Sequence, residues 1–516
     1  MLKMGVLFCY ACICGMLVVP LVWLVCSASM IVLPLLPAVA AIASIVASVI
    51  FRRIVPREQD ADISFGFLHP FCSSGGGGER VLWCAIKSIE EGFKTSPKSC
   101  DVIVYTCDGP EIRDEDILRG VKKHFNITID TASAKKFRVR FVRINTQNWI
   151  SASRYPVFTL LGQSLGSMVM AIDALRRARP HVFVDTTGLA FTYPVARWLG
   201  WCDVVSYTHY PTISTDMLEV VRNRRAQFNN SERVASSFVR THVKLAYYKL
   251  FAAIYGWCGR RADVVMANSS WTMNHVNSIF RVPRRTVLVY PPCDTEALQK
   301  IAIDEPRRKP RRILSIAQFR PEKNHALQLR ALHHLLSVDA KSEDEFSDVV
   351  LDVVGSCRNA GDRVRQSELE ALRDSLDELS SSNVRFHVNA PYSKLQELLG
   401  EATVGIHTMC DEHFGISVVE MMAAGVVPIA HKSAGPLMDI IGCHRPSPGY
   451  LATNEKEYAA CLARALREGD LSPKRRLGRE HARRFSHAEF RRRFWGAIAG
   501  VLQTDSARSA SAEKRE

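Results

Sequence analysis

The sharpest chemical signal in the sequence is a pair of carboxylates, Glu412 and Glu420, eight positions apart. Gly415 lies between them, where an apolar stretch that we expect to be a helix begins. Free amides at the start of a helix bind phosphate, and carboxylates accept hydrogen bonds from hydroxyl groups. The segment, with Phe414 and Ile416 on either side of the glycine, therefore predicts a site for a phosphorylated, hydroxyl-rich ligand.

A second candidate site is the glycine run 75–78, which lies between a predicted strand and a predicted helix. Gly76, Gly77 and Gly78 allow the backbone to approach a ligand closely, and the helix that follows directs its free amides at the loop. The loop is therefore expected to hold a phosphate or an anionic transition state. The run is not G-x-G-x-x-G and no Walker lysine follows it, so neither a dinucleotide fold nor a P-loop is supported.

Two further segments supply cations and a proton-transfer group. Arg320 and Lys323 follow a predicted strand, where their side chains can neutralise a diphosphate. His209 follows another buried strand and is a candidate to donate a hydrogen bond or transfer a proton. A surface pair of cations and a structural histidine are the alternative interpretations of these two patterns.

These residues fall into an alternation of strands and helices that predicts parallel sheets covered on both faces. The expected strands are Ile63–Leu68, Val102–Tyr105, Val139–Val142, His181–Val184, Val204–Tyr207, Val264–Ala267, Val287–Tyr290, Ile313–Ala317, Val350–Val354, Val384–Val388, Val404–Thr408 and Val427–Ala430. The polar segment Cys293–Arg311 interrupts the series and is typical of a linker. Ligands of such sheets bind at the carboxyl ends of the strands, so the candidate sites should face a common cleft.

The domain organisation follows from these patterns. We expect an α/β protein with two doubly wound Rossmann-like domains facing each other across a cleft, at 60–298 and 305–470. A basic helical segment at 471–502 would either lie on an anionic membrane or pack on the body with a solvated face. The last residues, 503–516, are polar and small, which is typical of a disordered tail.

The amino-terminal segment 1–55 is predicted to be a transmembrane anchor. No charged residue occurs from Met4 to Ile50. This uncharged stretch is longer than the ~20 residues that cross a bilayer. Prolines interrupt it, so both a single span and a hairpin of two remain open. Arg52, Arg53 and Arg57 follow it, and the positive-inside rule then places the body in the cytosol.

The composition indicates which classes of ligand and which redox compartment suit the protein. The formal net charge of +15 favours anionic ligands, while nucleic acid is not supported, because no zinc-finger, RNA-binding or basic-zipper pattern is present. The 15 cysteines form no disulfide pattern, which suits a reduced compartment.

Taken together, the sites resemble the retaining nucleotide-sugar transferases of glycosyltransferase family four, which have the GT-B fold. Glu412 and Glu420 match the E-x7-E pattern of that family. The dolichol-pathway α-1,2-mannosyltransferases are more similar still, over about residues 60–500. That likeness rests on the strings HPFCSSGGGGERVLWCAIKSI, YTHYPTISTDML, AQFRPEKNHALQLRAL, VGSCRN and HFGISVVEMMAAGVVPIAHKSAGPLMDII.

The resemblance implies a role for each candidate residue. Lys323 and Arg320 would bind the donor diphosphate, although the family often has an arginine at the position of Gln318. Glu420 would bind the nucleotide ribose, and Glu412 would lie near the transferred sugar. His209 would lie beside the reacting sugar, and the loop glycines Gly76, Gly77 and Gly78 near the diphosphate and acceptor.

The resemblance also implies an activity and a location. It predicts transfer of mannose from GDP-mannose to a dolichol-pyrophosphate-linked oligosaccharide, as the fourth and fifth mannoses of the N-glycan precursor. No metal or other cofactor is expected. Membrane lipid and other mannosyltransferases of the pathway are expected partners, at the cytosolic face of the endoplasmic reticulum. Another lipid-linked sugar transferase and an inactive membrane-tethered scaffold are the alternatives, and a nicotinamide oxidoreductase is disfavoured by the missing glycine fingerprint.

Overall fold

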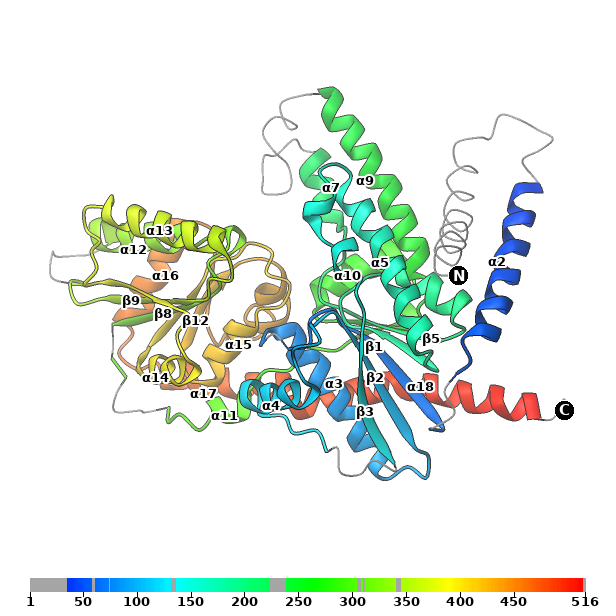
Figure 1. Ribbon diagram of the computed structural model, residues 1–516. Coiled ribbons are helices and arrows are strands. Elements are labelled where there is room, and N and C mark those ends of the chain that lie inside the picture. Colours follow the sequence, from blue (N-terminus) through cyan, green and yellow to red (C-terminus); the bar gives the residue numbers. More distant parts are fainter. Residues whose placement is uncertain are drawn as a thin grey trace.

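The protein is described here by a computed structural model covering residues 35–57, 61–73, 75–130, 136–222, 238–303, 308–309, 311–339 and 345–513. Two α/β domains lie side by side, each built around a twisted sheet with helices on both faces (Figure 1). The expected pair of doubly wound domains is therefore confirmed, and the chain passes from the last strand of the first sheet, which ends at Leu288, to the first strand of the second, which begins at Arg312.

The amino-terminal domain contains, within the described ranges, a seven-stranded sheet in the order β3-β2-β1-β4-β5-β6-β7. Its strands are β1 (Ile63–Leu68), β2 (Cys100–Thr106), β3 (Phe137–Arg143), β4 (Val182–Asp185), β5 (Asp203–Thr208), β6 (Val264–Ala267) and β7 (Thr286–Leu288). All neighbouring strands are parallel. Every residue of β1 is buried, because helices cover both faces of a parallel sheet.

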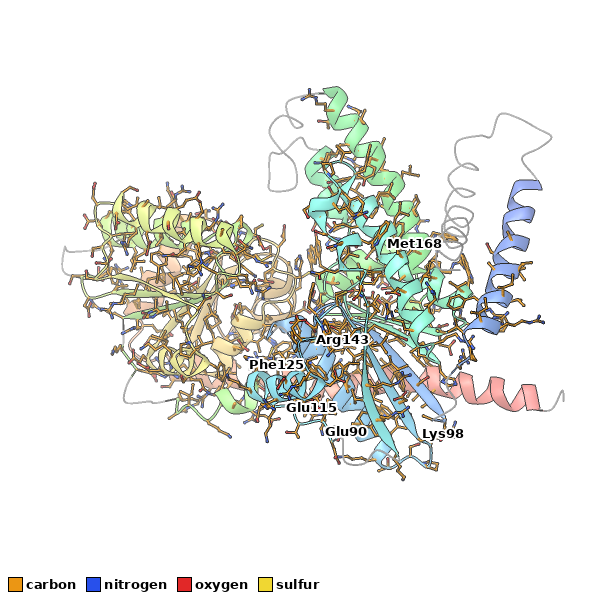
Figure 2. All side chains as sticks on the ribbon, in the orientation of Figure 1. Glu90, Lys98, Glu115, Phe125, Arg143 and Met168 are labelled. Carbon is orange, nitrogen blue, oxygen red and sulfur yellow. The ribbon has the colours of Figure 1, made fainter. Side chains whose placement is uncertain are left out.

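Helices divide between the two faces of this sheet. The helices of the domain are α3 (Gly77–Lys94), α4 (Asp114–Phe125), α5 (Thr159–Arg177), α6 (Thr192–Pro194), α7 (Thr215–Arg222), α9 (Phe238–Gly259) and α10 (Ser270–Phe280). Helices α3 and α4 cover one face, and α5, α9 and α10 the other (Figure 1). Phe125 and Met168, labelled in Figure 2, belong to the two apolar clusters that form on these opposite faces.

The carboxyl-terminal domain repeats this plan with six strands among the described residues, in the order β10-β9-β8-β11-β12-β13. The strands are β8 (Arg312–Ile316), β9 (Val350–Gly355), β10 (Val384–Val388), β11 (Val404–His407), β12 (Val427–His431) and β13 (Tyr450–Ala452). Its helices are α12 (His325–His334), α13 (Ala360–Asp374), α14 (Tyr392–Glu401), α15 (Ile416–Ala423), α16 (Glu455–Arg467) and α17 (Ser472–Ala482). In both sheets the strand order reverses beside the first strand, which opens a crevice at the carboxyl ends of the strands.

The chain crosses between the domains twice. The first crossing contains the short helix α11 (Thr295–Leu298). The second leads into α18 (His487–Glu513), which leaves the carboxyl-terminal domain and runs along the amino-terminal one beside α3 (Figure 1). Phe490 and Phe494 of α18 are buried in the amino-terminal core, and Ser88 of α3 donates a hydrogen bond to the Arg491 carbonyl at 2.8 Å.

The aromatic side chains of the basic segment 471–502 pack against the body: Phe485, Phe490 and Phe494 are buried, while Arg492 is exposed. Binding of this segment to an anionic membrane stays a prediction. Helix α18 continues to Glu513, so helical structure reaches well into the range 503–516 that composition alone assigned to a disordered tail.

Most of the apolar amino-terminal segment, residues 1–34, lies outside the described residues. Its carboxyl end forms helix α2 (Leu35–Ile54), in which Ser48 donates a hydrogen bond to the Trp198 carbonyl and Arg52 lies over the Trp201 ring. None of the described helices combines the length and the apolar character that a bilayer-crossing span requires.

Candidate functional site

A cleft of about 630 Å³ lies between the two domains, at the carboxyl ends of both sheets. Its amino-terminal wall comes from the loops after β1, β5 and β6, and its carboxyl-terminal wall from the loops after β8, β9, β10 and β11. The sequence-predicted residues that line it are Gly76, Gly77, Gly78, His209, Lys323, Glu412, Phe414, Gly415, Ile416 and Glu420. Residues up to 344 positions apart therefore meet in one site.

Lys323 and Glu412 form an ion pair in this cleft, with 2.6 Å between the lysine Nζ and the glutamate Oε2. His407, the last residue of β11, contacts the same oxygen through Nε2 at 3.0 Å. Burial alone would raise the pKa of Glu412, but Lys323 and His407 outweigh it and hold that pKa far below its usual value. The carboxylate is therefore ionised, and Lys323, which also donates to the Met409 sulfur, retains one N–H donor for a ligand.

Arg320 occupies a different position from Lys323. Its side chain is 39% exposed, its guanidinium lies 3.8 Å from the Glu322 carboxylate, and it is not among the residues that line the cleft. Gln318 does line it. The expected contact of Arg320 with a diphosphate thus remains a prediction, and in this conformation it would require the arginine to turn inward.

Gly415 creates the turn that starts α15. Its φ of +109° lies in the left-handed region, which side chains other than glycine rarely adopt. The helix then begins at Ile416 with its free amides near the cleft and carries Glu420 along its length. The Phe414 ring is buried against Tyr290 and Phe485, so its side chain mainly supports the turn.

The glycine loop approaches the opposite domain closely. A Cβ atom on Gly77 would lie 2.9 Å from Cδ1 of Ile416, and one on Gly78 would lie 3.9 Å from Nε2 of His209. Helix α3 starts at Gly77 and no side chain caps it, so its first amides remain available to a ligand. These glycines therefore keep space open where the two helix starts face each other.

Asp108, beyond the end of β2, holds the start of this loop. Its carboxylate accepts hydrogen bonds from the backbone N–H groups of Cys72 and Ser73 at 2.9 and 3.1 Å, and from the Ser73 hydroxyl at 2.7 Å. Burial would raise the pKa of Asp108, but these hydrogen bonds lower it overall. The Asp108 carboxylate thus orients the residues that lead into the glycine run, and the glycines have no side chains that could do so.

His209 is a half-buried histidine whose Nε2 is shielded from solvent. Its Nε2 has no hydrogen-bond partner within the part of the chain that the structure describes, and the residue lines the cleft. Burial and the nearby His413 lower its pKa to about 4, so the ring is neutral at physiological pH. A neutral imidazole with an unpaired nitrogen can exchange a hydrogen bond with a bound hydroxyl.

Several cleft residues were not singled out from the sequence. Arg80 lies in the first turn of α3, Arg358 follows β9, and Asn268 follows β6. A polar residue just beyond the carboxyl end of a buried strand was the available signal for Arg358 and Asn268. Arg80 stood next to the glycine run, but only its contact with Glu420 across the cleft reveals its position.

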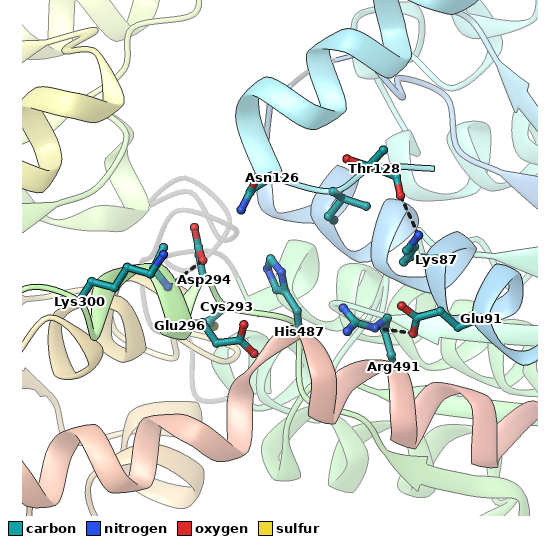
Figure 3. A pocket seen from close by; sticks show the side chains of 12 residues that line it. Lys87, Glu91, Asn126, Thr128, Cys293, Asp294, Glu296, Lys300, His487 and Arg491 are labelled. Carbon is teal, nitrogen blue, oxygen red and sulfur yellow. Dashed lines mark hydrogen bonds and ion pairs between the residues drawn. The ribbon is translucent and has the colours of Figure 1, made fainter. Parts of the chain in front are cut away.

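A second hollow of about 280 Å³ lies where α3, the linker with α11 and the start of α18 meet (Figure 3). Arg491 pairs with Glu91 at 2.9 Å, and Lys87 donates a hydrogen bond to the Thr128 carbonyl at 2.8 Å. Burial lowers the pKa of His487 in this hollow to about 4. None of the predicted site residues lines it, so we assign the chemistry to the larger cleft.

Comparisons with known proteins agree with this architecture. Residues 62–280 match the family model described as ALG11 mannosyltransferase N-terminus, and residues 298–485 match Glycosyl transferases group 1. The two models correspond to the two domains, and α18, which follows the carboxyl-terminal domain in sequence but packs on the amino-terminal one, lies outside both.

Curated relatives match across both domains. A protein of Xenopus laevis named GDP-Man:Man(3)GlcNAc(2)-PP-Dol alpha-1,2-mannosyltransferase is 43% identical, over 83% of this chain and 85% of its own. Proteins of the same name from Homo sapiens and Dictyostelium discoideum are 42% and 39% identical, covering 85% and 89% of this chain and 87% and 89% of their own.

Solved structures share the fold at low sequence identity. Anabaena HepE in complex with UDP and glucose aligns with a TM-score of 0.53 at 16% identity, covering 86% of this chain and all of that chain. A trehalose 6-phosphate synthase of Burkholderia multivorans aligns with a TM-score of 0.58 at 13% identity, covering 86% and 99%. At these identities the likeness supports the GT-B arrangement of the two domains and no more.

Proposed function

Because this chain belongs to the family of GDP-Man:Man(3)GlcNAc(2)-PP-Dol α-1,2-mannosyltransferases, we propose that it transfers mannose from GDP-mannose to a dolichol-pyrophosphate-linked oligosaccharide. The product would carry the fourth and fifth mannoses of the N-glycan precursor. The observation that supports this most strongly is the single cleft in which both carboxylates of the E-x7-E pattern, Lys323 and the glycine loop come together.

The charges in the cleft suit a leaving nucleoside diphosphate. Lys323 and the free amides at the starts of α3 and α15 converge from the two domains. Such preorganised donors stabilise negative charge as it develops on a leaving group. We assign diphosphate binding to Lys323 and these amides, with the transfer proceeding without a metal ion.

The remaining residues would position the sugars. Glu412 is ionised and held by two partners, so it can accept hydrogen bonds from hydroxyls of the transferred mannose. Glu420 would accept those of the ribose, and neutral His209 would contact the reacting mannose from the opposite wall. Retention of configuration would then rely on positioning and charge stabilisation by these groups, without a side-chain nucleophile.

The decisive test is product analysis with defined substrates. Purified protein in detergent is incubated with GDP-mannose and the trimannosyl dolichol-pyrophosphate acceptor, with and without a chelator, and the product linkages are determined. We expect α-1,2-linked mannose, unaffected by the chelator, and no transfer from UDP-glucose. Equal turnover of UDP-glucose contradicts the donor assignment, and binding of GDP-mannose without transfer favours the inactive scaffold.

We also propose that the body faces the cytosol at the endoplasmic reticulum membrane, which would let it contact membrane lipid and other mannosyltransferases of the pathway. Three glycosylation sequons, at Asn126, Asn229 and Asn268, test this orientation. Asn268 is only 5% exposed, so the absence of a glycan there would not report on the orientation. Asn229 lies outside the described residues. Asn126 is exposed at the end of α4 and is therefore the diagnostic site.

We expect Asn126 to remain unmodified in the native protein, because sequons are glycosylated only in the secretory lumen. Peptide mass spectrometry with and without glycosidase measures this directly, and protease treatment of sealed microsomes provides the control. A glycan at Asn126, or a body protected from protease, would reverse the proposed orientation.

A further inference from the structure

Arg80 connects the two domains inside the cleft. It lies in the first turn of α3, directly after the glycine loop, and its Nη1 is 2.9 Å from Oε1 of Glu420 on α15. The two side chains are only 13% and 15% exposed, and both line the cleft. An arginine of the amino-terminal domain therefore reaches a carboxylate of the other domain within the candidate site.

Glu420 stabilises the charged form of the Arg80 guanidinium. Burial lowers the pKa of the Arg80 guanidinium, but the charge and hydrogen bond of Glu420 outweigh this and hold that pKa above its usual value. The guanidinium carbon also lies over the Phe125 ring, 5.6 Å from its centroid. Separating a largely buried pair leaves an uncompensated charge, which is costly, so Glu420 is fixed where Arg80 places it.

Only half of the Glu420 carboxylate is engaged. Oε1 is bound by Arg80, whereas Oε2 has no hydrogen-bond partner among the described residues. A carboxylate held by one oxygen presents the other in a fixed direction, ready to accept a hydrogen bond. Since α15 itself supplies no other partner for this carboxylate within the described ranges, its orientation depends on the opposite domain.

We propose that Arg80 is a positioning residue for donor binding: its ion pair across the cleft orients Glu420 so that the free oxygen meets the ribose hydroxyls of the nucleotide. The inference rests on the proposed function, because it takes Glu420 as the ribose-binding carboxylate. It adds that the amino-terminal domain helps to bind the nucleotide, through a residue that need not touch it. Full donor affinity then requires the two domains to be together.

The test compares donor affinity in Arg80→Met, Arg80→Lys, Glu420→Gln and the double variant Arg80→Met/Glu420→Gln. Hydrogen bonds to charged groups change an equilibrium constant by about tenfold to hundredfold. We expect Arg80→Met to raise the KM for GDP-mannose and weaken GDP binding, measured by calorimetric titration, by a factor in that range. The kcat at saturating donor and the acceptor KM should stay near those of the unaltered protein, and Arg80→Lys should recover part of the affinity.

The double variant separates positioning from direct contact. If Arg80 acts through Glu420, the double variant binds GDP as weakly as Glu420→Gln alone, because the two effects are not additive. A further loss of affinity in the double variant means that Arg80 touches the donor itself, and unchanged affinity in Arg80→Met means that it does not position Glu420. Either result overturns the proposal.

Two controls keep the outcome decisive. Arg119→Met, on the exposed surface of α4 where Arg119 pairs with Asp116, should leave every parameter unchanged. If Arg80→Met fails to fold, Arg80→Lys takes its place, alone and combined with Glu420→Gln: a loss of GDP affinity in Arg80→Lys that disappears in the Glu420→Gln background supports positioning, and any other result overturns it. Absence of mannosyl transfer by the unaltered protein contradicts the proposed function instead, and the GDP titrations then still judge the role of Arg80.

Discussion

Replacing Lys323 by alanine is expected to lower kcat by about 10²–10³, the usual effect of removing one group that stabilises developing charge on a leaving group. Lys323 is the cation that the cleft places against Glu412, 2.6 Å away. Its loss removes positive charge from the proposed diphosphate site and leaves Glu412 with His407 as its remaining partner. Initial rates at saturating GDP-mannose and acceptor measure the effect.

Lys474→Ala is the matched control for this experiment. Lys474 forms a pair of the same 2.6 Å length, with Glu468, and its side chain is exposed to a similar extent, 24% against 21% for Lys323. It does not line the cleft, so its replacement should leave kcat unchanged. Near-normal transfer by a folded Lys323→Ala protein, or an equal loss in both variants, would show that the diphosphate is bound elsewhere.

His209→Ala is expected to lower kcat by about 10²-fold, the lower end of what one hydrogen bond made in the transition state contributes. The buried Nε2 of His209, which has no hydrogen-bond partner among the described residues, lies on the wall opposite Glu412, where we propose that it contacts the reacting sugar. Because its pKa is lowered to about 4, the ring stays neutral across the neutral range. The pH–rate profile of the unaltered protein should therefore show no ionisation of His209 near pH 6.5.

His333→Ala, at the end of α12 away from the cleft, provides the control. Asparagine at position 209 retains a hydrogen-bonding group and should recover part of the rate. A pH–rate profile with an ionisation near 6.5 that disappears in His209→Ala would contradict the neutral role, and an unchanged kcat would remove His209 from the site.

Most of the fold could be predicted from the sequence because buried parallel strands are continuous apolar runs. The expected range Ile63–Leu68 coincides with the fully buried β1, and Val264–Ala267 with β6. Strand β13 was missed, since Tyr450–Ala452 is short and contains no β-branched residue. The helix α11 was hidden in the polar linker, where four residues give no periodic pattern.

The candidate site was predictable only in part. Each glycine turn or charged residue after a strand predicts part of one wall of the cleft only, because such signals are local in sequence. The partners of those residues are not: Arg80 and Glu420 are 340 positions apart, and no pattern within either segment indicates the other. The same reason explains Arg320, whose neighbourhood resembles that of Lys323 in sequence although only Lys323 lines the cleft.

The return of α18 to the amino-terminal domain determines how this protein would respond to a premature stop codon. A chain ending at Phe485 would keep both sheets and every residue assigned to the cleft. It would nevertheless lose Phe490, Phe494 and Ile498, each at most 2% exposed within the amino-terminal core. Their burial contributes about 5–9 kcal/mol in all, against a typical total stability of about 5–15 kcal/mol. A truncating mutation at the end of the gene would therefore destabilise the amino-terminal domain, which is synthesised first.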